Sequence, residues 1–316
     1  MADSRFSRTA AVSLWIGAAM IANTGVAVAQ TMYFTDAGQR TIQRANLACS
    51  GVAEVLVSSD LSGPCGIALD LTARKMYWVD NTAKRIQRGN MNGSGPVENL
   101  VTAGLDSPSA IALDLVGGHI YWTDVNARTI QRAPLNGGSP QLVLSNVSAF
   151  TVAVDAAGGK LYWADYSAQR IRRANLDGSG IQDLVSGVFS FGLTLDQAGG
   201  KIYWTEYFTR RVRRANLDGT AVETLLSLGS GTPHGIAVDS SGGKMYWVDS
   251  TQKRVFRANL DGTMYELLST PGLQNPTVLA LDPSGGVVRG DMNGDGVVNG
   301  QDIQQFVEAL LAPTSS

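Results

Sequence analysis

Short segments in which large apolar residues alternate with smaller ones recur six times along this chain. Each ends in an acidic residue, and their tyrosines lie 41 to 44 residues apart. The six copies are Met32–Asp36, Met76–Asp80, Ile120–Asp124, Leu161–Asp165, Ile202–Glu206 and Met245–Asp249. Alternation of this kind predicts a strand that is packed on both faces. A fixed period of this size indicates one supersecondary unit, repeated and stacked.

The rest of each period repeats as well. A polar turn leads to Arg-Ile-x-Arg-Ala-Asn-Leu-Asp-Gly or a near copy, as at residues 170–178, and Asn-Leu-Asp-Gly is typical of a hairpin turn. A Val/Leu-rich strand such as 182–185 follows, and then a loop. The last segment is Ile-Ala-Leu-Asp or a variant, at 67–70, 111–114, 152–155, 193–196, 236–239 and 279–282. Four short strands per period with no helix predict a propeller blade.

These motifs together resemble a known repeat. Tyr-Trp-x-Asp, Arg-Ile-x-Arg-Ala-Asn-Leu-Asp-Gly and Pro-x-Gly-Ile-Ala-Val-Asp are similar to the class B (YWTD) repeat of low-density lipoprotein receptors, over residues 32–286. The resemblance implies an all-β fold, a six-bladed β-propeller of four-stranded antiparallel blades. We therefore expect residues 30–286 to form one propeller domain.

The phase of the repeat predicts how the ring closes. The first copy begins at Met32, with the second strand of a blade, so that blade lacks its innermost strand. An unmatched inner-strand segment occurs at the other end, Val278–Asp282. We expect these two segments to pair, which removes two open sheet edges.

The N-terminal residues have the features of a secretory signal. Arg5 and Arg8 precede an apolar run from Ala10 to Ala22, and Ala27-Val28-Ala29 matches a small-residue cleavage site. A membrane anchor is the alternative, but the run is shorter than the ~20 residues that a spanning helix needs. We expect residues 1–29 to be removed and the mature protein to be secreted, periplasmic or at the cell surface, with no membrane span.

Charge and cysteine content add little chemistry. The net charge is −2, and no basic field of the kind that holds nucleic acid is evident. The two cysteines of an exported chain could form a disulfide. The repeat places Cys49 and Cys65 at opposite ends of a blade, separated by one strand of ~17 Å, whereas a disulfide needs Cα atoms within ~7 Å. We therefore expect free thiols.

Polar residues that recur in all six blades predict a structural role. The acids are Asp36, Asp80, Asp124, Asp165, Glu206 and Asp249, and the arginines are Arg44, Arg88, Arg132, Arg173, Arg214 and Arg257. One active site does not need six copies, and buried polar groups must be hydrogen-bonded. We expect these residues to fasten blade to blade.

Positions where the repeat varies are the candidates for function. The residue two before the first aliphatic of each inner strand is Cys65, Ser109, Phe150, Phe191, His234 or Thr277, and these should ring one mouth of the channel. Aromatic residues also follow the acid in two turns at that end. The predicted ligand-binding residues are Phe150, Tyr166, Phe191, Tyr207, Phe208 and His234. Exposed aromatic clusters anchor partners, and packing between blades is the alternative.

An enzyme is the competing class. Six-bladed propellers also host lactonases and lyases that hold a metal in the channel, which needs converging His, Glu or Asp side chains. The chain has two histidines. His119 lies in a Gly-Gly-x turn and is expected to be exposed, and His234 has no predicted partner. Neither Gly-x-Ser-x-Gly nor His-Glu-x-x-His occurs. No catalytic residue is predicted, and three converging acids or histidines at the mouth would favour the enzyme.

Residues 287–316 predict a separate element. Oxygen-bearing groups at positions 1, 3, 5, 7, 9 and 12 of a loop match an EF-hand calcium site. The predicted ligands are Asp291, Asn293, Asp295, Val297 (through its carbonyl), Asn299 and Asp302. Ile303, Phe306, Val307 and Leu310 then form the stripe of an amphipathic helix. This loop and helix resemble one half of a type I dockerin, the module that docks enzymes onto cohesins, whereas a complete dockerin has two such segments.

Two function classes follow. The favoured one is a non-catalytic extracellular binding or scaffolding protein for a protein or glycan ligand, with a calcium-dependent segment that docks on a cohesin-like partner, self-associates or acts as a sorting tag. The alternative is a dockerin-bearing enzyme or accessory protein of polysaccharide catabolism, or a lactonase or lyase with a metal in the channel.

Overall fold

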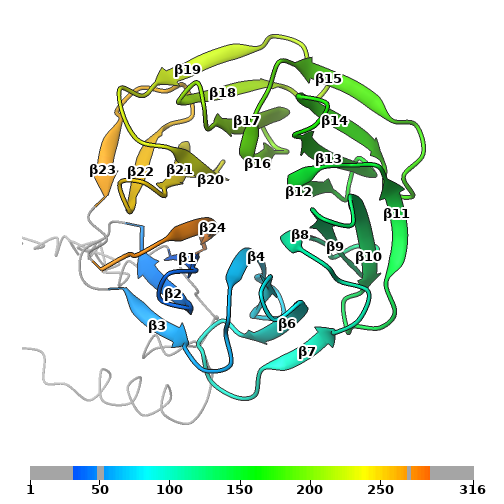
Figure 1. Ribbon diagram of the computed structural model, residues 1–316. Helices are drawn as coiled ribbons and strands as arrows, with labels where there is room; N and C mark the ends of the chain where they lie inside the picture. Colours follow the sequence, from blue (N-terminus) through cyan, green and yellow to red (C-terminus); the bar gives the residue numbers. More distant parts are fainter. Residues whose placement is uncertain (1–30, 48–52, 269–271, 285–316) are drawn as a thin grey trace, which may run out of the picture.

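A computed structural model describes residues 31–47, 53–268 and 272–284. Within these ranges the chain forms six four-stranded antiparallel sheets arranged around a central axis (Figure 1). All the elements there are strands, numbered β1 to β24, and no helix occurs among them. The predicted six-bladed, all-β propeller is confirmed.

Each blade runs from an innermost strand at the axis to an outermost strand at the rim (Figure 1). The innermost strands are β4 (Pro64–Asp70), β8 (Pro108–Asp114), β12 (Ala149–Asp155), β16 (Ser190–Asp196), β20 (Pro233–Asp239) and β24 (Pro276–Asp282). The second strands are β1 (Thr31–Asp36), β5 (Lys75–Asp80), β9 (His119–Asp124), β13 (Lys160–Asp165), β17 (Lys201–Glu206) and β21 (Lys244–Asp249). The third strands are β2 (Thr41–Asn46), β6 (Arg85–Asn90), β10 (Thr129–Pro134), β14 (Arg170–Asn175), β18 (Arg211–Asn216) and β22 (Arg254–Asn259). The outermost strands are β3 (Glu54–Val57), β7 (Glu98–Val101), β11 (Gln141–Ser145), β15 (Gln182–Ser186), β19 (Glu223–Ser227) and β23 (Glu266–Leu268).

The core lies between adjacent blades. Every second strand is buried along its last five residues, as its two apolar faces require. Tyr77 of β5 and Trp122 of β9, from neighbouring blades, belong to one apolar cluster. Because each blade is covered only by its neighbours, the ring is stable as a whole.

The two ends of the described chain share one blade. In β24, Leu281, Ala280 and Leu279 pair with Met32, Tyr33 and Phe34 of β1. This confirms the predicted closure. The innermost strands begin earlier than expected, at Pro64 and not Ile67 in β4, because an irregular register between these residues interrupts the alternation.

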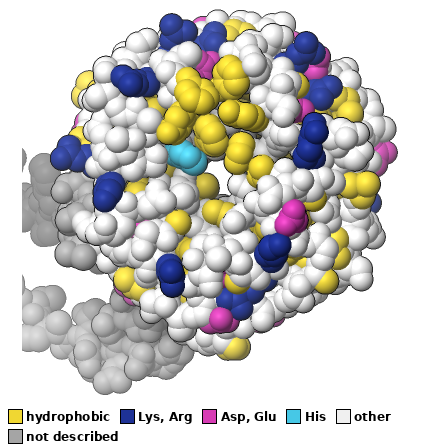
Figure 2. Space-filling view, in the orientation of Figure 1, with side chains coloured by type: hydrophobic (Ala, Val, Ile, Leu, Met, Phe, Trp, Pro, Cys, Tyr) yellow, Lys and Arg dark blue, Asp and Glu magenta, His cyan; other side chains and the backbone are white. Residues whose placement is uncertain are grey.

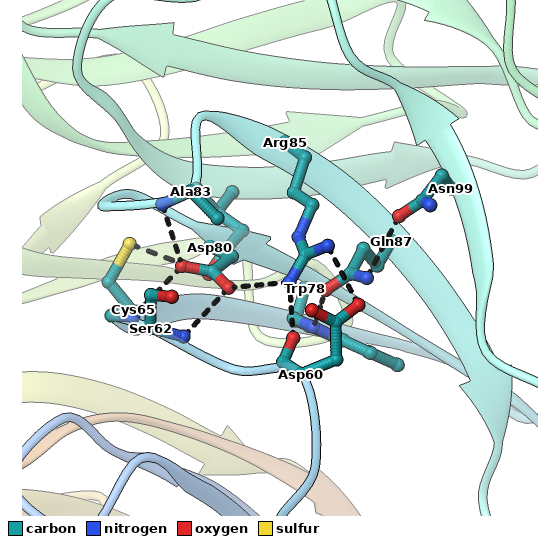
Figure 3. A network of polar contacts seen from close by, with 11 residues as sticks. Asp60, Ser62, Cys65, Trp78, Asp80, Ala83, Arg85, Gln87 and Asn99 are labelled. Atoms are coloured by element: carbon teal, nitrogen blue, oxygen red, sulfur yellow. Dashed lines mark hydrogen bonds and ion pairs between the residues drawn. The ribbon is translucent and has the colours of Figure 1, made fainter.

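The repeated acids do connect blades. The carboxylate of Asp80 accepts hydrogen bonds from the backbone N–H groups of Ser62 (3.0 Å) and Gly63 (2.9 Å), in the connector from β3 to β4. It also accepts one from Ala83 in its own turn, at 3.1 Å. Figure 3 shows this carboxylate at the centre of a polar network that includes Arg85, whose Nη2 lies 3.4 Å from it.

The repeated arginines join blades at the other end of the strands. Arg173 donates to the carbonyl oxygen of Leu217 at 3.0 Å, and Arg214 donates to that of Leu260 at 2.9 Å. Arg257 reaches the Leu47 carbonyl oxygen across the ring closure, at 3.3 Å. The predicted fastening role is confirmed for these side chains.

Asp36→Asn is expected to lower the free energy of unfolding by ~1.5–3 kcal/mol, the contribution of hydrogen bonds to a charged group. Asp36 is fully buried and accepts four backbone N–H groups, two of them from Gln274 (2.7 Å) and Asn275 (2.9 Å) in the closing connector. Denaturant unfolding measures the loss. The control is Asp261→Asn, in an exposed turn, and equal losses in both variants would contradict the fastening role.

Several expectations concern other parts of the chain. The signal peptide, Cys49, and the calcium loop and helix of residues 287–316 lie outside the described residues. Within the described ranges, no helix is long and apolar enough to cross a membrane.

Candidate functional site

The second residue of each innermost strand lies at one mouth of the channel. Contacts between neighbouring blades show the ring that these residues form. The rings of Phe150 and Phe191 have centroids 4.8 Å apart, and those of Phe191 and His234 are 5.1 Å apart. On the other side, the Cys65 thiol lies 3.1 Å from the Ser109 carbonyl oxygen. The predicted arrangement at the mouth is confirmed for these positions.

Aromatic residues from two turns join this ring. Tyr166 lies between β13 and β14, and its ring centroid is 5.7 Å from that of Phe150 and 6.1 Å from that of Phe191. Tyr207 and Phe208 lie between β17 and β18, and Tyr207 contacts Phe191 at 5.2 Å. All six predicted ligand-binding residues therefore fall in one cluster, with Phe191 at its centre.

Phe189 belongs to the cluster and was missed from the sequence. Its ring lies 5.6 Å from that of Tyr166 and 5.5 Å from that of Phe208. Its carbonyl oxygen accepts the Tyr207 N–H at 3.3 Å, as the Ser148 carbonyl accepts the Tyr166 N–H. A comparison of the six connectors would have found it, because the equivalent residues are Gly63, Ser107, Ser148, Thr232 and Asn275.

The aromatic patch, as we name it here, comprises Phe150, Tyr166, Phe189, Phe191, Tyr207, Phe208 and His234. Figure 2 shows hydrophobic side chains gathered beside the central opening, with a histidine at their margin. Phe208 is 59% exposed, and the other members are half-buried. The patch thus combines packing across three blades with an apolar surface that faces solvent.

His234 contributes an unsatisfied polar atom to the patch. Its Nδ1 is buried and has no hydrogen-bond partner within the described residues. Burial lowers the pKa of the imidazole, while a hydrogen bond that the ring donates to the Thr277 backbone and the charge of Asp249 act in the opposite direction. The ring is therefore neutral at pH 7.

His234→Phe is expected to make stability less dependent on pH between 7 and 5. In the wild type, the unfolded chain takes up the proton near the ordinary histidine pKa of 6.5, before the folded chain does. Stability therefore falls as the pH drops through that range. Phenylalanine occupies the equivalent position in β12 and β16, so the ring stacking should persist.

Melting temperatures at pH 8, 7 and 5 test this expectation. Both proteins should change alike between pH 8 and 7, where histidine is neutral in both states. Equal losses between pH 7 and 5 would show that His234 does not contribute.

Cys65 is chemically inert at this mouth. It forms no disulfide with any residue that the structure describes, and its thiol lies among backbone carbonyl groups of β5 and β8. Burial raises the pKa of the thiol to about 12, so it is protonated at neutral pH and is a poor nucleophile.

The channel itself is a cavity of about 360 Å³ whose lining residues are mostly aliphatic. One level of it is lined by Ala68, Ala112, Ala153, Thr194, Ala237 and Ala280. Among the described residues, no three His, Cys, Asp or Glu side chains lie close enough to hold a metal ion. His119 is half-buried at the start of β9, 6.3 Å from the Tyr121 ring, so its predicted exposure was wrong because the strand already begins there.

Comparison with known families identifies the type of repeat. The low-density lipoprotein receptor repeat class B model matches residues 30–71, 74–115, 200–240 and 243–283, more than half of the chain. The chain belongs to the low-density lipoprotein receptor class B repeat family. This class B propeller matches no protein in a search of curated sequences.

Solved structures share the fold of this class B propeller. A chain of the nidogen/laminin complex superposes with a TM-score of 0.72 at 21% identity, covering 80% of this chain and 98% of that one. A gluconolactonase from Xanthomonas campestris superposes with a TM-score of 0.57 at 19% identity, covering 68% of this chain and 78% of that one. A streptogramin B lyase superposes with a TM-score of 0.60 at 13% identity, covering 79% of this chain and 89% of that one. At these identities the likeness concerns the fold alone.

Proposed function

We propose that this protein is a non-catalytic extracellular binding protein whose propeller presents the aromatic patch to a partner protein. The patch is the observation that supports the proposal. It lies where the blades differ from one another, and it places seven rings from three blades at one mouth. A few residues, enriched in Trp, Tyr and Arg, supply most of the binding energy in protein interfaces, and an apolar cluster at a surface is typical of interaction sites.

The blades make this surface rigid. Phe150 and Phe191 are carried by β12 and β16, and the turn with Tyr207 is tied to the connector through Phe189. A preordered surface loses less conformational entropy on binding than a flexible loop does. Family membership and the propeller in the nidogen/laminin complex agree with a protein-binding role.

The enzyme alternative has weaker support. The gluconolactonase and the lyase share the fold. The mouth of this propeller, however, carries a single histidine, His234, beside phenylalanine rings, Ser109, Thr277 and a protonated thiol, whereas a channel metal would need several acids or histidines. A glycan ligand is the second candidate, because tyrosine rings also stack on sugars.

Capture experiments with the whole mature protein test the proposal. Wild-type protein and a Tyr166→Ala/Tyr207→Ala/Phe208→Ala variant are immobilised and offered extracellular proteins and glycans. We expect one protein to be retained by the wild type and lost from the variant. A glycan retained in the same way would favour the second candidate. Equal retention by the immobilised wild type and the immobilised variant would refute the proposed site.

The C-terminal residues extend this proposal. We infer that Asp291–Asp302 binds one calcium ion and that the ion orders the helix from Ile303 to Leu311 for docking on a cohesin-like partner, for self-association or for sorting. Asp291, Asp295 and Asp302 repel one another without a cation. A helix shorter than ~12–15 residues is marginal alone, so the loop that starts it decides whether it forms.

Calorimetric titration should therefore detect one calcium site, and Asp295→Ala should abolish it. EGTA should leave the main unfolding transition unchanged, because no metal-binding cluster occurs in the described propeller. A large fall of that transition in EGTA would place a structural calcium in the ring and would support the metal-channel enzyme.

A further inference from the structure

The turns that carry Tyr166 and Tyr207 belong to a set of six equivalent turns. In each, the first residue after the acid donates its N–H to a carbonyl oxygen of the connector, at 2.6 to 3.3 Å. All six turns therefore lie at the patch end of the propeller. The last residue of each turn has a positive φ: Arg40, Lys84, Arg128, Gln169, Arg210 and Lys253. Five of these six exposed residues are cations.

More cations follow where the third strands begin. Arg170, Arg211 and Arg254 are exposed at the starts of β14, β18 and β22. Some cations on this face are paired: Lys84 with Asp106, Arg85 with Asp60, and Arg170 with Asp183. Others form no ion pair within the described residues, namely Arg40, Arg128, Arg210, Arg211, Lys253 and Arg254.

The acids of the same turns do not offset this excess at the surface. These acidic side chains are buried, and the carboxylates of Asp36 and Asp80 accept hydrogen bonds from backbone N–H groups. Figure 2 shows Lys and Arg side chains spaced around the face, outside the hydrophobic patch. A partner approaching this face therefore meets exposed cations around an apolar centre.

The opposite end of the propeller carries both acids and bases, since Arg173 and Arg214 also lie there. Its hairpin turns expose Asp177, Asp218 and Asp261, and hydrogen bonds from Ser179, Thr220 and Thr263 lower the pKa of these carboxyl groups. The net charge of −2 for the whole chain thus does not describe the patch end, where several exposed cations form no ion pair within the described residues. Long-range electrostatic steering of a partner depends on the charges of the face that it approaches, and not on the net charge alone.

We propose that the partner of the aromatic patch is an acidic polypeptide segment, in which aromatic or aliphatic side chains alternate with Asp or Glu. This rests on the proposed function. The apolar side chains lie on the patch, and the carboxylates lie on Arg210 and Arg211, which follow Phe208 in sequence, and on Lys253 and Arg254 in the next blade. Guanidinium groups bind carboxylates through paired hydrogen bonds.

The shape of the patch favours a polypeptide over a polysaccharide or a nucleic acid. Two pairs of neighbouring rings stand nearly perpendicular to each other, with interplanar angles of 87° for Phe150 and Tyr166 and 90° for Phe189 and Phe208, whereas Phe191 and His234 stack at 27°. The perpendicular pairs offer gaps for side chains and interrupt any flat platform for a sugar or a base. Four of the six aromatic carbon rings are phenylalanines, which cannot hydrogen-bond to sugar hydroxyl groups.

Selection from a phage library of random peptides tests the partner's chemistry with the whole mature protein as bait. We expect the retained peptides to be enriched in Asp, Glu and large apolar residues and depleted of Lys and Arg. A synthetic copy of one such peptide should bind Arg210→Gln/Arg211→Gln/Arg254→Gln about tenfold more weakly than wild type at low salt. The difference should shrink at high salt, because exposed charges are screened.

The control variant is Asp177→Asn/Asp218→Asn/Asp261→Asn, which alters three charges on the far face and should bind the peptide as wild type does. Equal binding by the arginine variant, together with loss in the Tyr166/Tyr207/Phe208 variant, would overturn the acidic partner and leave the proposed function standing. Absence of any patch-dependent peptide would count against both. Tighter patch-dependent binding of polygalacturonate or single-stranded DNA would also overturn the polypeptide.

Discussion

Truncation after Asn275 is expected to abolish the cooperative unfolding of the propeller, whereas truncation after Ser284 should leave it intact. The first truncation removes β24, which supplies the innermost strand of the blade that β1 begins. It removes the ladder to β1 and the buried Leu279, which packs with Met32 and Phe34. It also removes Asp282, which pairs with Arg74 of the next blade at 2.7 Å.

The size of the effect follows from the position of β24, which is the innermost strand of its blade and packs against β20 and β4 of the two neighbouring blades. Loss of one buried leucine side chain costs ~2–5 kcal/mol, and domains are stable by only ~5–15 kcal/mol. Removal of a whole strand exposes the inner faces of the strands on both sides, so the deficit exceeds the total stability. Calorimetry of both truncated proteins measures it. A shared melting temperature would mean that the ring does not need this strand.

The arrangement of the blades could be predicted because it is encoded locally and repeatedly. Each second strand must bury both faces, and this requirement is written into the alternating segments such as Leu161–Asp165. Ring closure followed from the unmatched segment near Leu279. The early starts of the innermost strands could not be predicted, because the irregular register between Pro64 and Ile67 breaks the alternation.

The candidate site was only partly accessible to such reasoning. The rings at repeated positions, such as Phe150 and Phe191, were found because the repeat aligns them. Phe189 lies two residues before Phe191, at a connector position that is small or polar in the other blades, and only an alignment of the six connectors brings it out. The cations were overlooked for a different reason. A single Arg210 in a turn is an ordinary solvated residue, and only the closed ring shows that five equivalent turns end in a cation.

Replacement of Tyr166, Tyr207 and Phe208 by alanine is expected to weaken partner binding more than it weakens folding. Anchors in an interface each contribute ~2 kcal/mol or more to binding. Phe208 is 59% exposed, and substitutions at exposed positions usually change stability by less than ~0.5 kcal/mol. Tyr166 and Tyr207 are half-buried, so the triple variant should lose some stability as well.

Replacement of Phe191 by alanine should instead weaken folding more than it weakens partner binding. Its ring contacts those of Phe150, Tyr166, Tyr207 and His234, so it supports the patch from within. Phe191→Ala should therefore approach the ~3–5 kcal/mol cost of removing a buried aromatic side chain. Chemical denaturation of both variants would separate the supporting ring from the exposed ones.

The most direct test is to measure partner affinity and the free energy of unfolding together for Phe208→Ala, with Val116→Ala as the control. Val116 is 85% exposed, and it lies in the turn after β8 at the opposite end of the propeller. The partner is the captured protein or a selected patch-dependent peptide. We expect Phe208→Ala to weaken binding about thirtyfold, which corresponds to ~2 kcal/mol, with stability almost unchanged, and Val116→Ala to change neither. Unchanged affinity for Phe208→Ala, or a large loss of its stability, would contradict the assignment of the aromatic patch as the binding surface.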